Sequence, residues 1–197
     1  MVNEPYRRRL NPEPFTIISS DCTGGCMYHD LGREFLSPTI NLFMDAPDFV
    51  RFCAEYRRCL NTPLRDAGVH PIEGYPMATL GGGVSLHLVH YANFEEAREK
   101  WEIRAGKVLP DEDRIFFIMN DRNNCTENDL RAFANLPYRH KALLVHRPRK
   151  DIECSYYIKG YEQETEVGIM TAYAGLVKRN YDQFDWVEFL NGCQVSF

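Results

Sequence analysis

The sequence predicts an α/β protein with a mainly parallel sheet covered by helices on both faces, in a Rossmann-like arrangement. Three observations predict this class. Short apolar runs alternate along the chain with segments of helical periodicity. The most apolar run, Arg114–Met119, is typical of a strand buried on both faces. Gly and small polar residues follow the first run at 20–25, and ligands of open α/β sheets bind outside the carboxyl ends of strands.

The first half of the chain predicts two strands, each followed by a helix, and then a loop. We expect strands at Phe15–Ser19 and Thr39–Phe43, helices at 26–33 and 47–60, and a loop at 61–75. Pro47 suits the first turn of the second helix, where apolar residues then recur at three- and four-residue steps. Pro, Gly and Asp residues punctuate the expected loop.

The second half predicts a hairpin and then further alternation of helices and strands. We expect two strands within Met77–Tyr91, strands at 114–119, 142–145 and 154–158, and helices at 93–107, from 126 onward, and at 184–190. Gly81–Gly83 is interpreted as the turn of the hairpin. The alternative, a phosphate-binding loop, lacks the Lys-Ser/Thr pair of a P-loop. Asn93 and Thr126 are suitable helix N-caps, with acidic residues three positions later.

The length of 197 residues suits one domain, or two small lobes that share a core. We expect a single α/β domain over 14–192, with a second lobe from about 147 as the variant, and a polar N-terminal extension over 1–13. The 44% hydrophobic and 26% charged content is that of a globular protein.

Charge and cysteine usage exclude several classes of protein. The net charge of -5 argues against nucleic acid as a partner. The basic clusters Arg7–Arg9 and Arg147–Lys150 are short; we expect exposed surface there, with contact to an anionic lipid or phosphate as the alternative. No apolar run is long enough to span a bilayer. Seven Cys without a CxxC pair favour reduced thiols in a bacterial-type cytoplasm and predict no metal site.

The loop after the first strand is the first candidate binding site. Gly24 and Gly25 can adopt backbone angles closed to other residues, and a helix that starts nearby directs free N–H groups into the loop. We therefore expect the loop to hold the polar head of a ligand through Ser20, Asp21, Cys22, Gly24 and Gly25.

The loop after the most apolar strand is the second candidate. Asp121 is expected to act as a base, to accept from a hydroxyl or to bind a cation, and Arg122 to contact a phosphate. The alternative is structural: Asp121 stabilises a turn and Arg122 pairs with a surface carboxylate.

His90 and Tyr91 end the second strand of the hairpin and complete the set of candidates. His90 is the candidate base and Tyr91 a candidate ligand contact, although a lone His is more often structural. Cys22 is weighed as a nucleophile because a helix N-terminus lowers the pKa of a thiol. A buried, unreactive Cys is the more common case.

Eight segments together resemble a bacterial family of unassigned function, the domain-of-unknown-function family nineteen-nineteen. They are Ile17–Gly25, Ser37–Phe43, His87–Tyr91, Lys100–Arg104, Asp121–Thr126, Leu136–Tyr138, Ile158–Tyr161 and Tyr181–Trp186, spread from about Phe15 to Gly192. The first loop of that family more usually contains Asn-Asn-Cys and a bulky residue before the Gly pair, so Asp21 and Thr23 depart from its pattern. Its members are often described as exopolysaccharide or capsule biosynthesis proteins, and no settled catalytic residues can be carried over.

The resemblance implies a role in surface-polysaccharide assembly. Combined with the two polar loops, it leads us to expect a glycosyltransferase-like transferase that takes a nucleotide-sugar donor, with or without a divalent cation. Two alternatives stay open: a non-catalytic carbohydrate-binding or assembly protein of the same pathway, and an acyl or acetyl transferase that acts on a sugar through Cys22 or His90.

Overall fold

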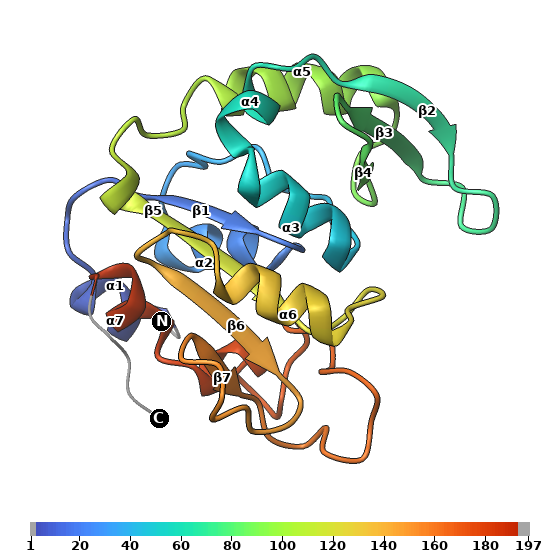
Figure 1. Ribbon diagram of the computed structural model, residues 1–197. Helices are drawn as coiled ribbons and strands as arrows, with labels where there is room; N and C mark the ends of the chain where they lie inside the picture. The colour runs from blue at the N-terminus through green and yellow to red at the C-terminus, as the bar shows by residue number, and fades with distance from the viewer. Residues whose placement is uncertain (1–2, 193–197) are drawn as a thin grey trace.

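The computed structural model describes residues 3–192, which form a parallel sheet and a smaller antiparallel sheet (Figure 1). The parallel sheet has the strand order β1-β5-β6-β7, with β1 at Thr16–Ser19, β5 at Ile115–Asn120, β6 at Lys141–Val145 and β7 at Ser155–Tyr157. The antiparallel sheet has the order β2-β3-β4, with β2 at Arg65–Val69, β3 at Pro76–Leu80 and β4 at Val84–His87. The antiparallel sheet therefore lies, in sequence, between the neighbouring strands β1 and β5.

Seven α-helices lie within the described residues. They are α1 (Glu4–Arg9), α2 (Thr23–Leu31), α3 (Ala46–Ala54), α4 (Tyr56–Leu60), α5 (Phe94–Ala105), α6 (Glu127–Ala134) and α7 (Trp186–Leu190). In Figure 1, α3 and α6 lie in front of the parallel sheet and α2 lies behind it. Helices α4 and α5 lie between the two sheets at the top of the view.

Alternate residues of the parallel strands face two separate hydrophobic cores, as the period of two in a β-strand requires. Ile18 and Phe117 belong to the core under α3 to α6. Ile17 and Phe116 belong to the core shared with α2 and α7. All six residues of β5 are buried, which confirms the prediction of a strand covered on both faces.

The α/β class and the parallel sheet are confirmed, whereas two local expectations are wrong. The segment 39–43 is not a strand: Asn41 has a positive φ of 62°, and the segment makes an isolated bridge from Phe43 to His87. The expected loop at 61–75 contains β2, a strand whose residues are all exposed. An exposed strand carries no apolar alternation, so no periodic signal marked it.

The strand order lacks one feature of the expected Rossmann-like arrangement. A nucleotide site of that kind lies where the strand order reverses, and the order β1-β5-β6-β7 has no reversal. The residues after 147, where the variant of the single-domain expectation placed a second lobe, include β7, which pairs in parallel with β6.

The N-terminal residues, expected as a polar extension, include helix α1, which packs on the rest of the chain. Leu10 is buried, and the ring of Tyr6 lies 5.0 Å from that of Trp186. Arg9 donates to the carboxylate of Asp185 at 2.6 Å. Residues 4–10 thus cover α7. Across residues 3–192, no helix combines the length and apolar character needed to cross a membrane.

Candidate functional site

The loops that follow β1 and β5 meet at the carboxyl edge of the parallel sheet. The two strands are parallel neighbours that end at Ser19 and Asn120, and Nδ2 of Asn120 donates to Oδ2 of Asp21 at 2.8 Å. The structure therefore brings Asp21 and the Asp121 loop together, although the loops are far apart in the sequence.

The β1 loop is held by hydrogen bonds within the chain. The hydroxyl of Ser19 donates to the carbonyl of Asp21 at 2.6 Å and accepts from the N–H of Gly24 at 3.1 Å. Oδ1 of Asp21 accepts from the N–H of Thr23 at 2.9 Å. Both carboxylate oxygens of Asp21 therefore have protein donors.

The glycine pair has a different role from the one expected. Helix α2 begins at Thr23, so Gly24 and Gly25 lie inside it with ordinary helical angles rather than in an open loop. A Cβ on Gly24 would lie 2.7 Å from Oγ of Ser19 and 2.9 Å from Cγ2 of Ile17. Gly24 is thus required where α2 packs on β1, and the expectation of a glycine turn before a helix from residue 26 is wrong.

Two buried hydroxyls beside this loop have no hydrogen-bond partner within residues 3–192. They belong to Ser20 and Thr23, which are 3% and 1% exposed. Buried polar groups are nearly always paired, and leaving one unpaired costs about 1–3 kcal/mol. Two of them on either side of Asp21 indicate that this loop is not optimised for the stability of the free protein.

Asp121 is a buried carboxylate that joins three segments. Its Oδ2 accepts from the backbone N–H of His146 at 2.9 Å and lies 2.5 Å from Nδ1 of the same residue. Its Oδ1 accepts from the N–H of Val167 at 2.8 Å. The side chain is 7% exposed, so its oxygens face the protein rather than a ligand.

The Asp121–His146 pair has the geometry of an oriented general base. A carboxylate only accepts hydrogen bonds, so Nδ1 of His146 is the donor in this contact, and Nε2 is the ring nitrogen that the contact leaves for another partner. The His146 side chain is 18% exposed, which leaves the ring partly accessible. A histidine fixed in this way by a carboxylate can take a proton from a hydroxyl or a water.

Sequence reasoning missed His146. The signal was present, because His146 follows the expected strand 142–145 directly and so lies at the carboxyl edge, like Ser20 and Asp121. The basic run Arg147–Lys150 follows directly, and because of it this part of the chain was interpreted as an exposed charged surface.

The rest of the β5 loop is strained and tied to its surroundings. Asn123 and Asn124 both have positive φ, 58° and 62°, a conformation that costs energy in any residue but Gly. Nδ2 of Asn124 donates to Asp45 at 3.1 Å. Arg122 donates from Nη1 to the carbonyl of Val167 at 3.3 Å and lies 3.6 Å from Glu166. The pairing of Arg122 with a carboxylate, one of the two expectations, is thus present, and several of its N–H groups remain for an anion.

His90 and Tyr91 do not join Asp121. His90 is exposed, and its backbone N–H donates to Asn41 at 3.3 Å. Tyr91 is buried; its hydroxyl donates to the carbonyl of Ile40 at 2.8 Å and accepts from Arg104 at 2.9 Å. Among residues 3–192, no hydrogen bond or ion pair links either side chain to the Asp121–His146 pair, so Tyr91 holds the 39–44 segment instead.

Cys22 is half-buried, with Sγ 3.7 Å from the carbonyl oxygen of Leu42. Burial, reinforced by the charge of Asp21, raises the pKa of Cys22 to about 12. This direction is opposite to the lowering expected from the helix N-terminus, because desolvation disfavours the thiolate. The thiol is protonated near neutral pH and is poorly suited to act as a nucleophile.

The described side chains at the joined loops do not form a metal site. Within the described part of the chain, no group of three or more His, Cys, Asp or Glu side chains is arranged to hold a metal ion. Asp21, the acidic residue at the joined loops besides Asp121, already accepts from Thr23 and Asn120.

Comparison with known proteins adds a family to this geometry. The family model described as "Domain of unknown function (DUF1919)" matches residues 1–191. An uncharacterized protein of Haemophilus influenzae is 35% identical over 191 residues, covering 96% of this chain and 90% of the relative. The chain belongs to the DUF1919 family, as its sequence segments indicated.

Proposed function

We propose that this DUF1919 protein is a transferase that moves a sugar from a nucleotide-linked donor to a hydroxyl group of a carbohydrate acceptor. Surface polysaccharide is the product class we propose. The observation that carries the proposal is the buried contact between Asp121 and Nδ1 of His146 at the carboxyl edge of a parallel sheet.

The position of this pair supports a role in chemistry rather than in packing. Ligands of open α/β sheets bind outside the carboxyl ends of the strands. His146 follows β6, Asp121 follows β5 and Ser20 follows β1, so three neighbouring strands contribute to one edge. Catalytic groups are commonly displayed on such loops by a rigid scaffold.

The β1 loop and Arg122 supply binding groups of the required kind. The unpaired hydroxyls of Ser20 and Thr23 suit a polar ligand that the loop admits by a small movement. The guanidinium of Arg122 can bind a phosphate through its remaining N–H groups. These contacts would hold the donor beside the acceptor hydroxyl.

The step assigned to the pair is a proton transfer coupled to sugar transfer. Nε2 of His146 accepts the proton of the acceptor hydroxyl, and the hydroxyl oxygen forms a bond to the anomeric carbon of the donor. The bond from that carbon to the donor phosphate breaks, and the nucleotide leaves with the electron pair. Asp121 orients the ring and stabilises the imidazolium that forms.

No step is assigned to a divalent cation. The side-chain oxygens of Asp21 and Asp121 already accept hydrogen bonds from the protein, so the described residues do not offer a preformed set of ligands. A cation carried by the donor diphosphate is tested in the experiment below.

Calorimetry against a panel of nucleotide sugars, with Mg²⁺, with Mn²⁺ and with EDTA, tests donor binding. Release of the nucleotide in the presence of oligosaccharide acceptors then tests turnover. His146→Gln should lower turnover by about 10²- to 10⁴-fold and retain donor binding. His90→Gln, which alters an exposed histidine outside the pair, should change neither. Absence of binding at millimolar donor overturns the proposal.

A non-catalytic carbohydrate-binding role is the second candidate, and one observation favours it. Both oxygens of the Asp121 carboxylate accept hydrogen bonds from the backbone N–H groups of His146 and Val167, as those of a purely structural residue would. Oligosaccharide binding that survives Asp121→Ala in a folded variant, with no turnover of any donor, would establish this second role. Release of free thiol from acetyl-CoA would instead indicate acyl transfer.

A further inference from the structure

A cavity lies far from the carboxyl edge, between α4, the end of α5 and residues 106–110. It has a volume of about 630 Å³, within the range of small-molecule sites, roughly 300–1,000 Å³. Residues 106–110 precede the amino end of β5, whereas the Asp121–His146 pair follows the carboxyl ends of β5 and β6. The cavity is therefore separate from the proposed active site.

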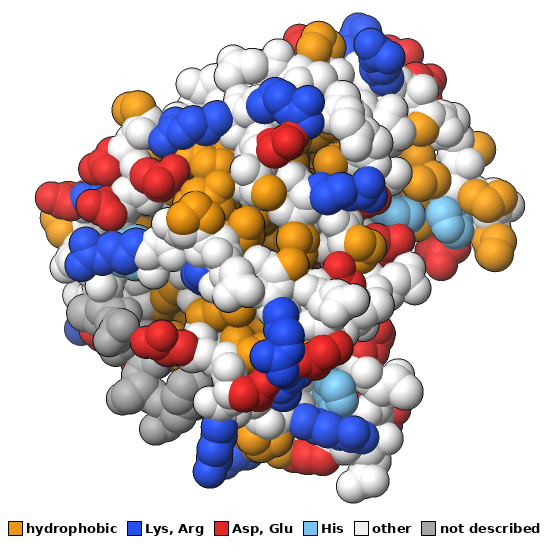
Figure 2. All heavy atoms as spheres, viewed as in Figure 1, with side chains coloured by type: hydrophobic (Ala, Val, Ile, Leu, Met, Phe, Trp, Pro, Cys, Tyr) orange, Lys and Arg blue, Asp and Glu red, His pale blue; other side chains and the backbone are white. Residues whose placement is uncertain are grey.

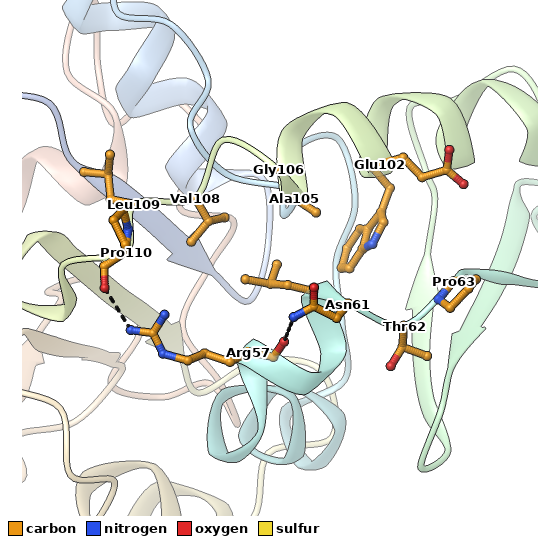
Figure 3. A pocket seen from close by; sticks show the side chains of 12 residues that line it. Arg57, Asn61, Thr62, Pro63, Glu102, Ala105, Gly106, Val108, Leu109 and Pro110 are labelled. Carbon is orange, nitrogen blue, oxygen red and sulfur yellow. Dashed lines mark hydrogen bonds between the residues drawn. The ribbon is translucent and has the colours of Figure 1, made fainter.

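The middle of the cavity is apolar. Leu60, Ala105 and Val108 line it together with the Trp101 ring. In Figure 3, Val108 and Ala105 lie on one wall of the cavity and the α4 helix forms the opposite wall. Figure 2 shows hydrophobic side chains gathered in the upper part of the visible face, with charged side chains around them. Such a lining favours a ligand with an apolar body.

One end of the cavity carries a cation with N–H groups to spare. The guanidinium of Arg57 is turned toward residues 108–110 (Figure 3) and donates from Nη2 to the carbonyl of Pro110 at 3.1 Å. Glu112 forms an ion pair with Arg57 at 3.7 Å from Nη2 but accepts no hydrogen bond from it, and it accepts one from the hydroxyl of Tyr56. Since a guanidinium has five N–H donors, most of those of Arg57 are available to an anion.

The other charged side chain of the lining does not compete. In Figure 3 the carboxylate of Glu102 lies at the far side from Arg57 and points away from it. Arg57 is the cationic side chain of the lining and Glu102 the anionic one, so an anionic group of a ligand would bind at the Arg57 end.

The wall of the cavity also contains an unpaired donor. Trp101 is 2% exposed, and its Nε1 has no acceptor within residues 3–192. A buried N–H without an acceptor destabilises the folded chain, because the water that it bonded in the unfolded state is not replaced. The protein leaves this wall incompletely paired, which is unusual for a surface that only packs.

From these observations we propose that the cavity binds an anionic amphiphile. Its apolar body would lie against Leu60, Ala105 and Val108, and its carboxylate or other anionic group would pair with Arg57. The ligand would bridge α4 and the loop that leads into β5, which the Arg57–Pro110 and Tyr56–Glu112 hydrogen bonds also join.

Decanoate tests the proposal, with decanol as its neutral counterpart. The chain has two Trp residues, so Trp186→Phe leaves Trp101 as the sole indole reporter in the cavity wall. Decanoate should change the Trp101 emission in a saturable manner, and calorimetry on the unmodified protein should give the same affinity. Decanol should bind more weakly than decanoate.

Two arginines of α4 provide a matched pair of variants. Arg57→Gln should weaken decanoate binding about tenfold and leave decanol unaffected, because it removes a charge-assisted hydrogen bond. Arg58→Gln, which alters a residue paired with Glu55 outside the lining, should leave both affinities unchanged. Ala105→Phe, which fills the apolar part, should abolish both.

Three results would overturn the proposal: no saturable binding of decanoate by calorimetry, equal losses in Arg57→Gln and Arg58→Gln, or decanoate binding unaffected by Ala105→Phe. Circular dichroism establishes that each variant is folded, and the comparison of decanoate with decanol on the unmodified protein needs no variant.

Discussion

Nδ2 of Asn120 donates to Oδ2 of Asp21 across the ends of two neighbouring parallel strands, at 2.8 Å. This contact joins the first polar loop of the chain to the loop that carries Asp121. Asp121, the next residue after Asn120, holds His146, so the chain at 120–121 links these two contacts at the ends of β1, β5 and β6. The predictions below test the parts of this network and of its support.

His146→Gln should lower the rate of sugar transfer by about 10²- to 10⁴-fold, the usual contribution of a general base. Binding of the donor should change little, since the lost group acts on the acceptor hydroxyl. Steady-state release of the nucleotide measures the effect. His90→Gln is the matched control, and an equal loss in both variants would contradict the assignment.

Asp121→Asn should destabilise the fold by about 2–3 kcal/mol, because it removes a charged acceptor and places an NH₂ group against a backbone N–H. Either His146 or Val167 then loses its acceptor. Urea denaturation measures the free energy of unfolding. Asp45→Asn, at a partly exposed carboxylate that accepts a hydrogen bond from Asn124, should cost well under 1 kcal/mol. Similar losses of unfolding free energy in the two variants would show that the buried hydrogen bonds of Asp121 contribute no more to stability than the exposed one of Asp45.

Gly24→Ala and Gly25→Ala should have opposite effects. A Cβ on Gly24 meets Ser19 at 2.7 Å, which overpacks the contact between α2 and β1 and should cost about 1–3 kcal/mol. A Cβ on Gly25 lies 3.5 Å from Ile40, ordinary contact, so Ala in this helix should stabilise by roughly 0.4–1 kcal/mol. Thermal denaturation compares the two. A stabilising Gly24→Ala would contradict the packing explanation.

Alkaline pH should destabilise the protein in part through Cys22. Its thiol has a pKa of about 12 in the folded chain and an ordinary value of 9.0, so unfolding between these values releases a proton. The free energy of unfolding should therefore fall as pH rises above about 9, by at most ~1.4 kcal/mol per pH unit from this group.

Urea denaturation from pH 7 to 10.5, for the natural chain and for Cys22→Ser, measures the share of this thiol. The serine hydroxyl does not titrate in this range, so the variant should lose less stability as pH rises. Parallel curves for the two proteins would show that Cys22 is as easily ionised folded as unfolded.

Elements with an apolar pattern could be predicted from the sequence. The buried strand β5 and the capped helix α6, which begins after Thr126, lie close to where periodicity and capping chemistry placed them. β2 could not be predicted, because its residues are exposed and its pairing with β3 depends on contacts distant from local patterning. Segment 39–43 is apolar enough for a strand, but its backbone at Asn41 leaves the extended region.

The candidate site was predictable in location but not in chemistry. The rule that ligands lie at strand carboxyl ends led to Ser20, Asp21 and Asp121, and it would have led to His146. The pairing of Asp121 with His146 depends on the strand order, since β6 had to be placed beside β5. Residue composition alone does not fix that order.

The pairing of Thr16 with Ile115 has a consequence for the newly made chain. During synthesis, β1 emerges from the ribosome long before its neighbour β5 exists, and the whole antiparallel sheet is translated in between. Helix α2, translated directly after β1, can cover one face of β1 in that interval, but the edge of β1 that pairs with β5 stays unpaired, which invites self-association of the nascent polypeptide. Assembly of the parallel sheet from a ribosome-bound fragment therefore cannot begin until residues 115–120 have left the exit tunnel.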